Sequence, residues 1–171
     1  MRIVPLPGYS PTVGRLVGML TYARQTLLGS VGGLSQQALD HLHDAQSNSI
    51  GALLAHSAAV ERWYQIFTFE ERRPSAGDES ALLPALELGD EGRRQLRGRN
   101  LVWYVERLSA VRAQTLAELG KRDDTWLEAP LKASAEVNAH WAWFHVAEDE
   151  INHRGQIRWL RTRLPTVAGA D

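Results

Sequence analysis

The chain has 171 residues, which is enough for one domain with a hydrophobic core of its own. It carries 19 basic and 20 acidic side chains, so its formal net charge is -1. This balance argues against a dedicated nucleic-acid-binding protein, since such proteins usually show a basic excess or a basic stripe. The chain contains no cysteine, which excludes disulfides, a cysteine nucleophile and cysteine-ligated zinc. Any metal ion must therefore be held by histidine and carboxylate groups.

The amino-terminal stretch, MRIVPLPGYSPTVG, lacks the charged start and the continuous apolar run of a signal peptide. No window approaches the roughly 18 apolar residues that a membrane-spanning helix requires. We therefore expect a soluble, cytoplasmic protein that has no membrane partner.

Four segments show the three- and four-residue apolar spacing of amphipathic helices, and no segment reads convincingly as a strand. In chain order, the expected helices span about residues 12–28, 49–67, 100–119 and 138–163. Pro11 in the first turn behind Ser10 is typical of a helix start, and Gly29 is suited to a helix end. Residues 33–42 predict a short connecting helical turn that is capped by Ser35.

Two long connections separate these helices. Residues 70–92 mix charge, glycine and proline around a short apolar patch, so we expect a long connection that crosses the domain or covers one end of it. Residues 121–134 form a second loop. Residues 1–171 are therefore predicted to be one all-α domain, a four-helix bundle with long connections between its second and third and its third and fourth helices.

His145, Asp149 and His153 follow one another at four-residue steps in the last predicted helix. Because an α-helix turns about 100° per residue, these side chains lie on one face. An aspartate and a histidine at this spacing can place an oxygen and a nitrogen on one metal ion. The flanking acids Glu148 and Glu150 point to either side, and we expect one or both to be solvated.

A third ligand must come from another helix, and His56 is the best candidate because it lies within the apolar stripe of the second helix. A buried imidazole needs a hydrogen bond or a metal ion. The pattern also fits a protein without metal, since Asp149 and His153 can form a hydrogen-bonded pair. In that case a backbone carbonyl or a water molecule would satisfy His56. The spacing alone leaves both alternatives open.

Three stretches of the sequence resemble the DinB/YfiT-like family. They are GLSQQAL (33–39), NSIGALLAHSAAVERWY (48–64) and HVAEDEINHRGQIRWLR (145–161), and together they cover nearly the whole chain. The resemblance implies a four-helix bundle in which three side chains hold a divalent nickel, zinc or iron ion. Carried over residue by residue, these ligands are His56, Asp149 and His153. Many members have histidine at the position of Asp149, so His145, one turn earlier, is an alternative ligand or a partner of the ligands.

The resemblance also implies thiol chemistry, because related proteins include bacillithiol S-transferases and a mycothiol-dependent maleylpyruvate isomerase. We therefore expect a metal-dependent S-transferase or isomerase that uses a low-molecular-weight thiol, such as bacillithiol or mycothiol, and a small electrophile. A metal ion with open positions can lower the pKa of a bound thiol, and the lack of cysteine fits a sulfur supplied by the cofactor. Arg154, beside His153, is the candidate for binding an anionic group of the cofactor. No catalytic residue is assigned.

The alternative is a non-catalytic, stress- or damage-associated helical bundle whose metal site is structural or vestigial, because a fold does not imply a function. Exposed faces of the first and third helices are candidates for a homodimer interface. Direct action on damaged DNA is a third possibility, which the charge balance and the lack of a basic stripe with interleaved aromatics oppose. Four aromatic residues are expected in the core or at an interface, namely Trp63, Tyr64, Trp141 and Trp143.

Overall fold

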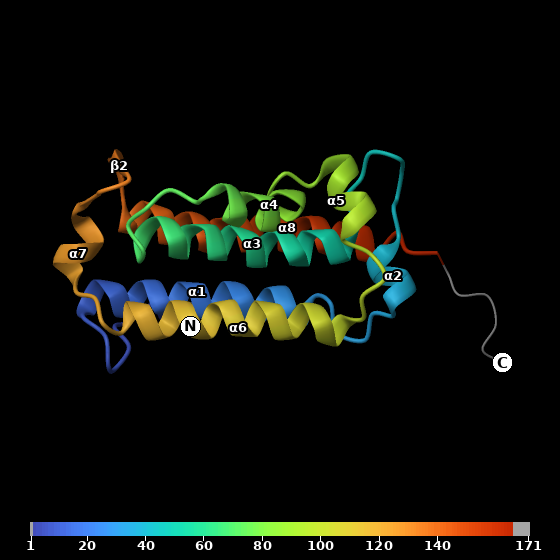
Figure 1. Cartoon of the computed structure of the whole chain (residues 1–171). Coiled ribbons are helices and arrows are strands. Elements are labelled where there is room, and N and C mark those ends of the chain that lie inside the picture. The colour runs from blue at the N-terminus through green and yellow to red at the C-terminus, as the bar shows by residue number, and fades with distance from the viewer. Residues whose placement is uncertain (1, 166–171) are drawn as a thin grey trace.

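The computed structural model describes residues 2–165, which are mainly helical, as predicted. The long helices of this part of the chain are α1 (Pro11–Gly29), α3 (Ile50–Thr68), α6 (Leu101–Leu119) and α8 (Ala139–Arg161). They lie side by side along one direction (Figure 1), and both α8 and α6 contact α1 and α3. Their bounds lie close to the predicted ones. None of the described helices is long and apolar enough to cross a membrane.

Local sequence signals determine where the long helices begin. The side chains of Ser49, Asn100 and Asn138 each accept a hydrogen bond from the backbone amide three residues later. Such caps satisfy amide groups that have no partner within the helix itself. Helix α1 begins with proline, and the hydroxyl group of Ser10 donates to Asp124 Oδ1 at 2.6 Å. The short helix α2 (Gln36–Asp40) has the predicted Ser35 cap.

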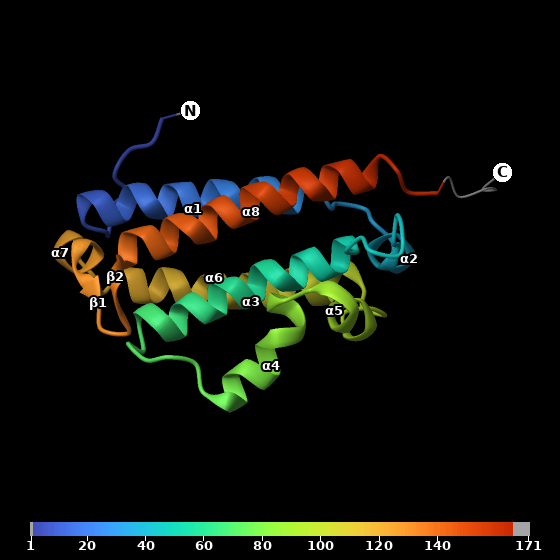
Figure 2. The same ribbon diagram turned by 90° about the horizontal axis from the view of Figure 1, so that it is seen from above.

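The two long connections contain secondary structure that the sequence did not predict. The first contains α4 (Ala76–Leu86), which lies beside α3 in Figure 2, and α5 (Gly89–Gln95). The second contains α7 (Asp124–Glu128) and an antiparallel pair of strands, β1 (Pro130–Leu131) and β2 (Ser134–Asn138). The expectation that no strand forms was therefore wrong. These strands are too short to show an alternating apolar pattern, and their pairing depends on the turn between them.

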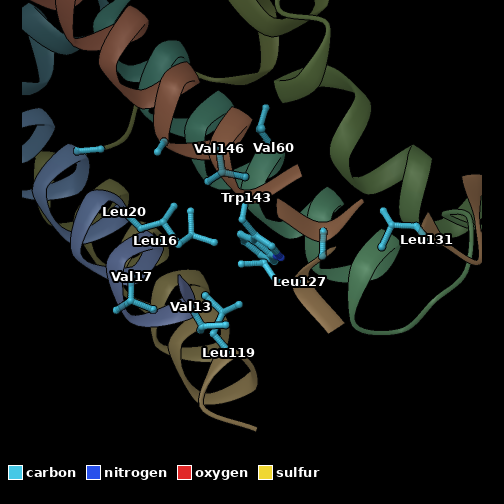
Figure 3. Packing of buried hydrophobic residues seen from close by; sticks show 13 residues of the cluster. Val13, Leu16, Val17, Leu20, Val60, Leu119, Leu127, Leu131, Trp143 and Val146 are labelled. Carbon is cyan, nitrogen blue, oxygen red and sulfur yellow. The ribbon is translucent and has the colours of Figure 1, made fainter. Parts of the chain in front are cut away.

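The apolar core forms two clusters that lie toward opposite ends of the long helices. One cluster surrounds Trp143, whose side chain is fully buried, as predicted (Figure 3). The ring of Phe69 stacks on it with ring centroids 4.9 Å apart. The second cluster includes Leu53, Leu108 and Ile157. Both clusters contain residues of all the long helices, so they hold the same helices together at two levels.

Between these apolar clusters lies a group of buried charges, which we call the charge cluster. Each long helix contributes one member, and the members are Arg24, Glu61, Arg112 and Glu150. Arg24 lies 2.6 Å from Glu61 Oε2, and its Nε atom lies 3.0 Å from Glu150 Oε1. Arg112 contacts the same two carboxylates at 2.6 and 2.7 Å.

Of the two acids that flank Asp149, Glu148 is 41% exposed, in agreement with the expectation that one or both are solvated, whereas Glu150 is fully buried. Burial raises the pKa of Glu150, and the charges of Arg24 and Arg112 oppose that rise. A buried carboxylate is tolerated where cationic partners and hydrogen bonds compensate for the loss of water. The two arginines come from α1 and α6, so the sequence around Glu150 carries no sign of them.

Candidate metal centre

The three side chains that the sequence nominates as metal ligands meet between α3 and α8. Asp149 Oδ1 lies 3.4 Å from His56 Nε2 and 3.2 Å from His153 Nε2. One potential ligand atom from each residue lies within 4.8 Å of the others. The three side chains are only 12–13% exposed. We call this group the triad.

Helix geometry and the α3–α8 contact explain why these side chains converge. Asp149 and His153 are four residues apart in α8, so they lie on one face of the helix, one turn apart. His56 lies within α3, among buried residues such as Leu53 and Val60. Because α3 packs against α8, the histidine of one helix faces the two ligand candidates of the other.

Both imidazole rings of the triad are oriented through their Nδ1 atoms. His56 Nδ1 lies 2.8 Å from the carbonyl oxygen of Ala85 in α4. His153 Nδ1 lies 3.1 Å from Gln156 Oε1, one turn further along α8. A carbonyl oxygen and an amide oxygen can only accept hydrogen bonds, so each Nδ1 carries the proton. A neutral ring then has its Nε2 lone pair free on the side where Asp149 lies, whereas a protonated ring donates a hydrogen bond from Nε2 to Asp149.

The carboxylate of Asp149 also fits a metal ion. Its Oδ2 atom is buried and has no hydrogen-bond partner among the described residues. Burial opposes ionisation, but the hydrogen bonds and charges of His153 and His56 outweigh it and lower the pKa of Asp149 well below its usual value. Two imidazole nitrogens and one carboxylate form a donor set that zinc, nickel and iron accept. The residues present therefore fit a divalent ion.

Two other residues nominated from the sequence lie outside the triad. His145 Nδ1 is 3.1 Å from Glu148 Oε2, and the ring of His145 stacks on Trp141 with centroids 5.3 Å apart. Arg154 donates a hydrogen bond to the hydroxyl group of Thr26 in α1. The structure thus brings together His56, Asp149 and His153, and it directs the other two side chains to different neighbours.

Next to the triad, aromatic side chains of α3 and α8 also contact one another. The ring of Tyr64 lies 5.8 Å from that of His145 and 6.4 Å from that of Trp141. Burial and the charge of Asp149 raise the pKa of Tyr64 to about 12. Trp141 is 48% exposed, so this side of the triad has an aromatic surface that is open to solvent.

Sequence reasoning missed the two groups that orient the histidines. Gln156 lies three residues after His153, a spacing that places both side chains on one helix face and offers a signal for their contact. The Ala85 carbonyl has no such signal, because it belongs to a helix in a connection of low predicted order. Its role depends on where α4 packs against α3.

The fold and the triad together define a helical protein with three potential metal ligands between two long helices. A family model described as Mycothiol-S-transferase matches residues 15–165, which include the whole triad. The chain therefore belongs to the mycothiol S-transferase family, within the DinB/YfiT-like superfamily that its motifs resemble. Comparison with curated proteins gives no match.

Proposed function

We propose that this protein transfers a low-molecular-weight thiol to a small electrophile, using a divalent metal ion held by His56, Asp149 and His153. The observation that carries the proposal is the convergence of two Nε2 atoms on one carboxylate, with both Nδ1 atoms already engaged elsewhere. The family assignment supports a thiol as the substrate and favours mycothiol over bacillithiol. An isomerase that uses the thiol as a cofactor would need the same centre.

The chain's own residues prepare this chemistry. Bound at the triad, a nickel, zinc or iron ion supplies Lewis acidity that lowers the pKa of a thiol. Ala85 and Gln156 hold the two histidines in the tautomer whose Nε2 atoms are free to coordinate. Asp149 contributes the negative charge. The nucleophilic sulfur must come from the small-molecule thiol, because the chain contains no cysteine.

The arrangement of α1, α3, α6 and α8 supports a four-helix bundle. The proposed single domain spans residues 1–171, of which residue 1 and residues 166–171 lie outside the described part of the chain. A homodimer through exposed faces of α1 and α6 is part of the same proposal, since Tyr22 and Val102 expose large apolar side chains on these helices. Static light scattering at micromolar concentration should then give twice the mass of one chain. The mass of a single chain would contradict the homodimer.

Elemental analysis of untagged protein, combined with a thiol-transfer assay, tests the proposed function. We expect about one nickel, zinc or iron ion per chain. We also expect metal-dependent conjugation of mycothiol to chlorodinitrobenzene above the uncatalysed rate. His56→Ala should lose both the ion and the activity. His140, in the first turn of α8, is not part of the triad, so the matched variant His140→Ala should keep both.

A folded wild-type protein that binds no metal and gives no thiol-dependent turnover would contradict the proposed function. That result would favour the alternative, a non-catalytic bundle with a vestigial site. Stoichiometric metal without any thiol-dependent turnover would instead favour a structural metal site.

A further inference from the structure

A cavity of about 430 Å³ lies between the start of α3 and the last turns of α8. We call it the Gly155 cavity, and its lining residues are Ser47, Asn48, Leu53, Gly155, Gln156, Trp159 and Leu160. Its volume is in the range of small-molecule sites. Gln156 connects it with the triad, since this side chain lines the cavity and also contacts His153 Nδ1.

Gly155 lies in the interior of α8, where glycine is unfavourable relative to alanine. Close packing does not explain it, because a Cβ atom added at Gly155 would meet no atom of the described residues within 4 Å. Gly51 in α3 is different, since an added Cβ there would lie 2.6 Å from the hydroxyl oxygen of Tyr104. The packing of the chain therefore does not require a glycine at position 155. The lack of a side chain there leaves open space beside the helix.

The chemistry of the lining indicates what kind of group fits this space. Among the described residues, no charged side chain lines the cavity, and its polar side chains are the hydroxyl of Ser47 and the amides of Asn48 and Gln156. The amide oxygen of Asn48 is buried without a hydrogen-bond partner. The Ser47 hydroxyl is engaged by the Asp44 backbone, and Gln156 Oε1 is engaged by His153. The Asn48 amide and the NH2 group of Gln156 offer one acceptor and several donors, which suits uncharged hydroxyl and amide groups of a ligand.

Trp159 adds an aromatic surface to this polar lining. It is 47% exposed. The guanidinium of Arg163 lies 3.9 Å from its ring centroid, and the ring of His43 meets it edge-on at 4.8 Å. These contacts hold the indole in place. An indole surface beside neutral hydrogen-bonding groups is suited to a ring that has apolar C–H faces and a polar edge.

We propose that the Gly155 cavity, which adjoins His153 through Gln156, binds the uncharged, hydroxyl-rich body of the thiol substrate. This inference rests on the proposed thiol-transfer function, and it adds the place where the part of the substrate that does not react would bind. A cysteine-derived thiol joined to a sugar-like body, as in mycothiol, has the matching chemistry. Through Gln156 this body would lie beside His153, on the Nδ1 side of the imidazole ring.

Filling the cavity tests the proposal without changing the triad. Gly155→Leu should weaken binding of mycothiol, measured by isothermal titration calorimetry, by at least about tenfold. The KM of the Gly155→Leu variant for N-acetylcysteine, a thiol without the hydroxyl-rich body, should stay within about twofold of the wild-type KM. The metal content should not change. Trp159→Ala is a second cavity variant, at a half-exposed position. We expect it to weaken mycothiol binding by about fivefold.

Gly18→Leu is the matched control. Gly18 also lies inside a long helix, an added Cβ there would meet no atom of the described chain within 4 Å, and it lines a different cavity. This variant should bind mycothiol as the wild type does. Circular dichroism and thermal unfolding of each variant establish that it is folded before its binding is compared.

Equal mycothiol affinity in the wild type and in both cavity variants would overturn the proposal. Wild-type protein that uses N-acetylcysteine as well as mycothiol would also overturn it, even with thiol transfer established. Mycothiol binding that depends on Gly155 but leads to no turnover would support the cavity while contradicting the proposed function.

Discussion

Asp149 and Glu150 are neighbours in α8, and their carboxylates belong to two different clusters. Asp149 lies 3.2 Å from His153 in the triad, whereas Glu150 contacts Arg24 and Arg112 in the charge cluster. Successive residues of a helix point about 100° apart, so the side chains of Asp149 and Glu150 lie on different faces of α8. Asp149 faces the candidate metal centre, and Glu150 faces the charge cluster in the middle of the fold. We therefore expect the contacts of Glu150 with Arg24 and Arg112 to oppose rotation of α8 about its axis, and so to help fix the direction of Asp149.

Replacing Glu150 by alanine should destabilise the fold by roughly 3–5 kcal/mol, because one buried carboxylate would remain for two buried guanidinium groups. Urea unfolding of the metal-free protein measures this difference. Glu148→Ala is the matched control, since the side chain of Glu148 is 41% exposed, and its effect should stay within about 0.5 kcal/mol. Similar unfolding midpoints for the two variants would contradict the structural role of the charge cluster.

Asp149→Ala should lower metal affinity by at least about 100-fold, because losing a direct ligand costs more than losing a group that orients one. Competition with a chromophoric chelator measures the affinity. His145→Ala should keep the wild-type affinity, since His145 contacts Glu148 and Trp141 instead of the triad. The opposite outcome, metal lost with His145→Ala and kept with Asp149→Ala, would identify His145 as the third ligand.

Metal affinity should fall as the pH is lowered from about 8 to about 5, because a histidine ligand must lose its proton to coordinate and free imidazole titrates in this range. In the metal-free protein burial lowers the pKa of His153, but the hydrogen bond and charge of Asp149 outweigh this and raise it overall. The lowered pKa of Asp149 keeps its carboxylate ionised over this range. Chelator competition at several pH values tests the prediction, and a pH-independent affinity would contradict coordination by histidine.

The same pKa shifts predict how the stability of the metal-free protein depends on pH. The raised pKa of His153 stabilises the folded protein at pH values below about 6.5, which is the pKa of histidine in the unfolded chain. This stabilisation is lost as the pH rises through the pKa of His153 in the folded protein. The lowered pKa of Asp149 stabilises the folded protein at pH values above about 4, which is the pKa of aspartate in the unfolded chain. This stabilisation is lost as the pH falls through the pKa of Asp149 in the folded protein.

The free energy of unfolding should therefore be higher for the wild type than for His153→Ala. This difference should be largest between about pH 4 and 6.5. Urea unfolding in the presence of a chelator measures this difference. A difference that grew between neutral pH and pH 9 would contradict the pairing of His153 with Asp149.

Alanine substitutions at two helical glycines should have opposite effects. Gly51→Ala should destabilise the fold by about 1–3 kcal/mol, because the new Cβ would collide with Tyr104 and approach the Leu39 carbonyl oxygen at 3.2 Å. Gly155→Ala should stabilise it by about 0.5–1 kcal/mol, because alanine favours the helix and the space is open. Thermal unfolding checks both. A destabilising Gly155→Ala would show that packing requires this glycine, which would remove the basis for the cavity argument.

The long helices and the ligand candidates were predictable because their signals are local. Caps such as Ser49 and Asn100 lie at the helix starts, and apolar spacing reports which face of a helix is buried. The four-residue step between Asp149 and His153 places both on one face of any helix. The connections were less predictable, since α4 and the β1–β2 pair are short elements with weak periodicity.

The sequence by itself determined the identity of the possible metal ligands, the lack of an internal thiol and the places where the long helices begin and end. Only the tertiary structure decided that Glu150 is buried, that the Ala85 carbonyl orients His56, and that Gly155 faces a cavity. The physical reason is that helix formation depends on neighbouring residues. The burial of a charge, the tautomer of a histidine and the space beside a glycine depend on groups that other helices bring from distant parts of the chain.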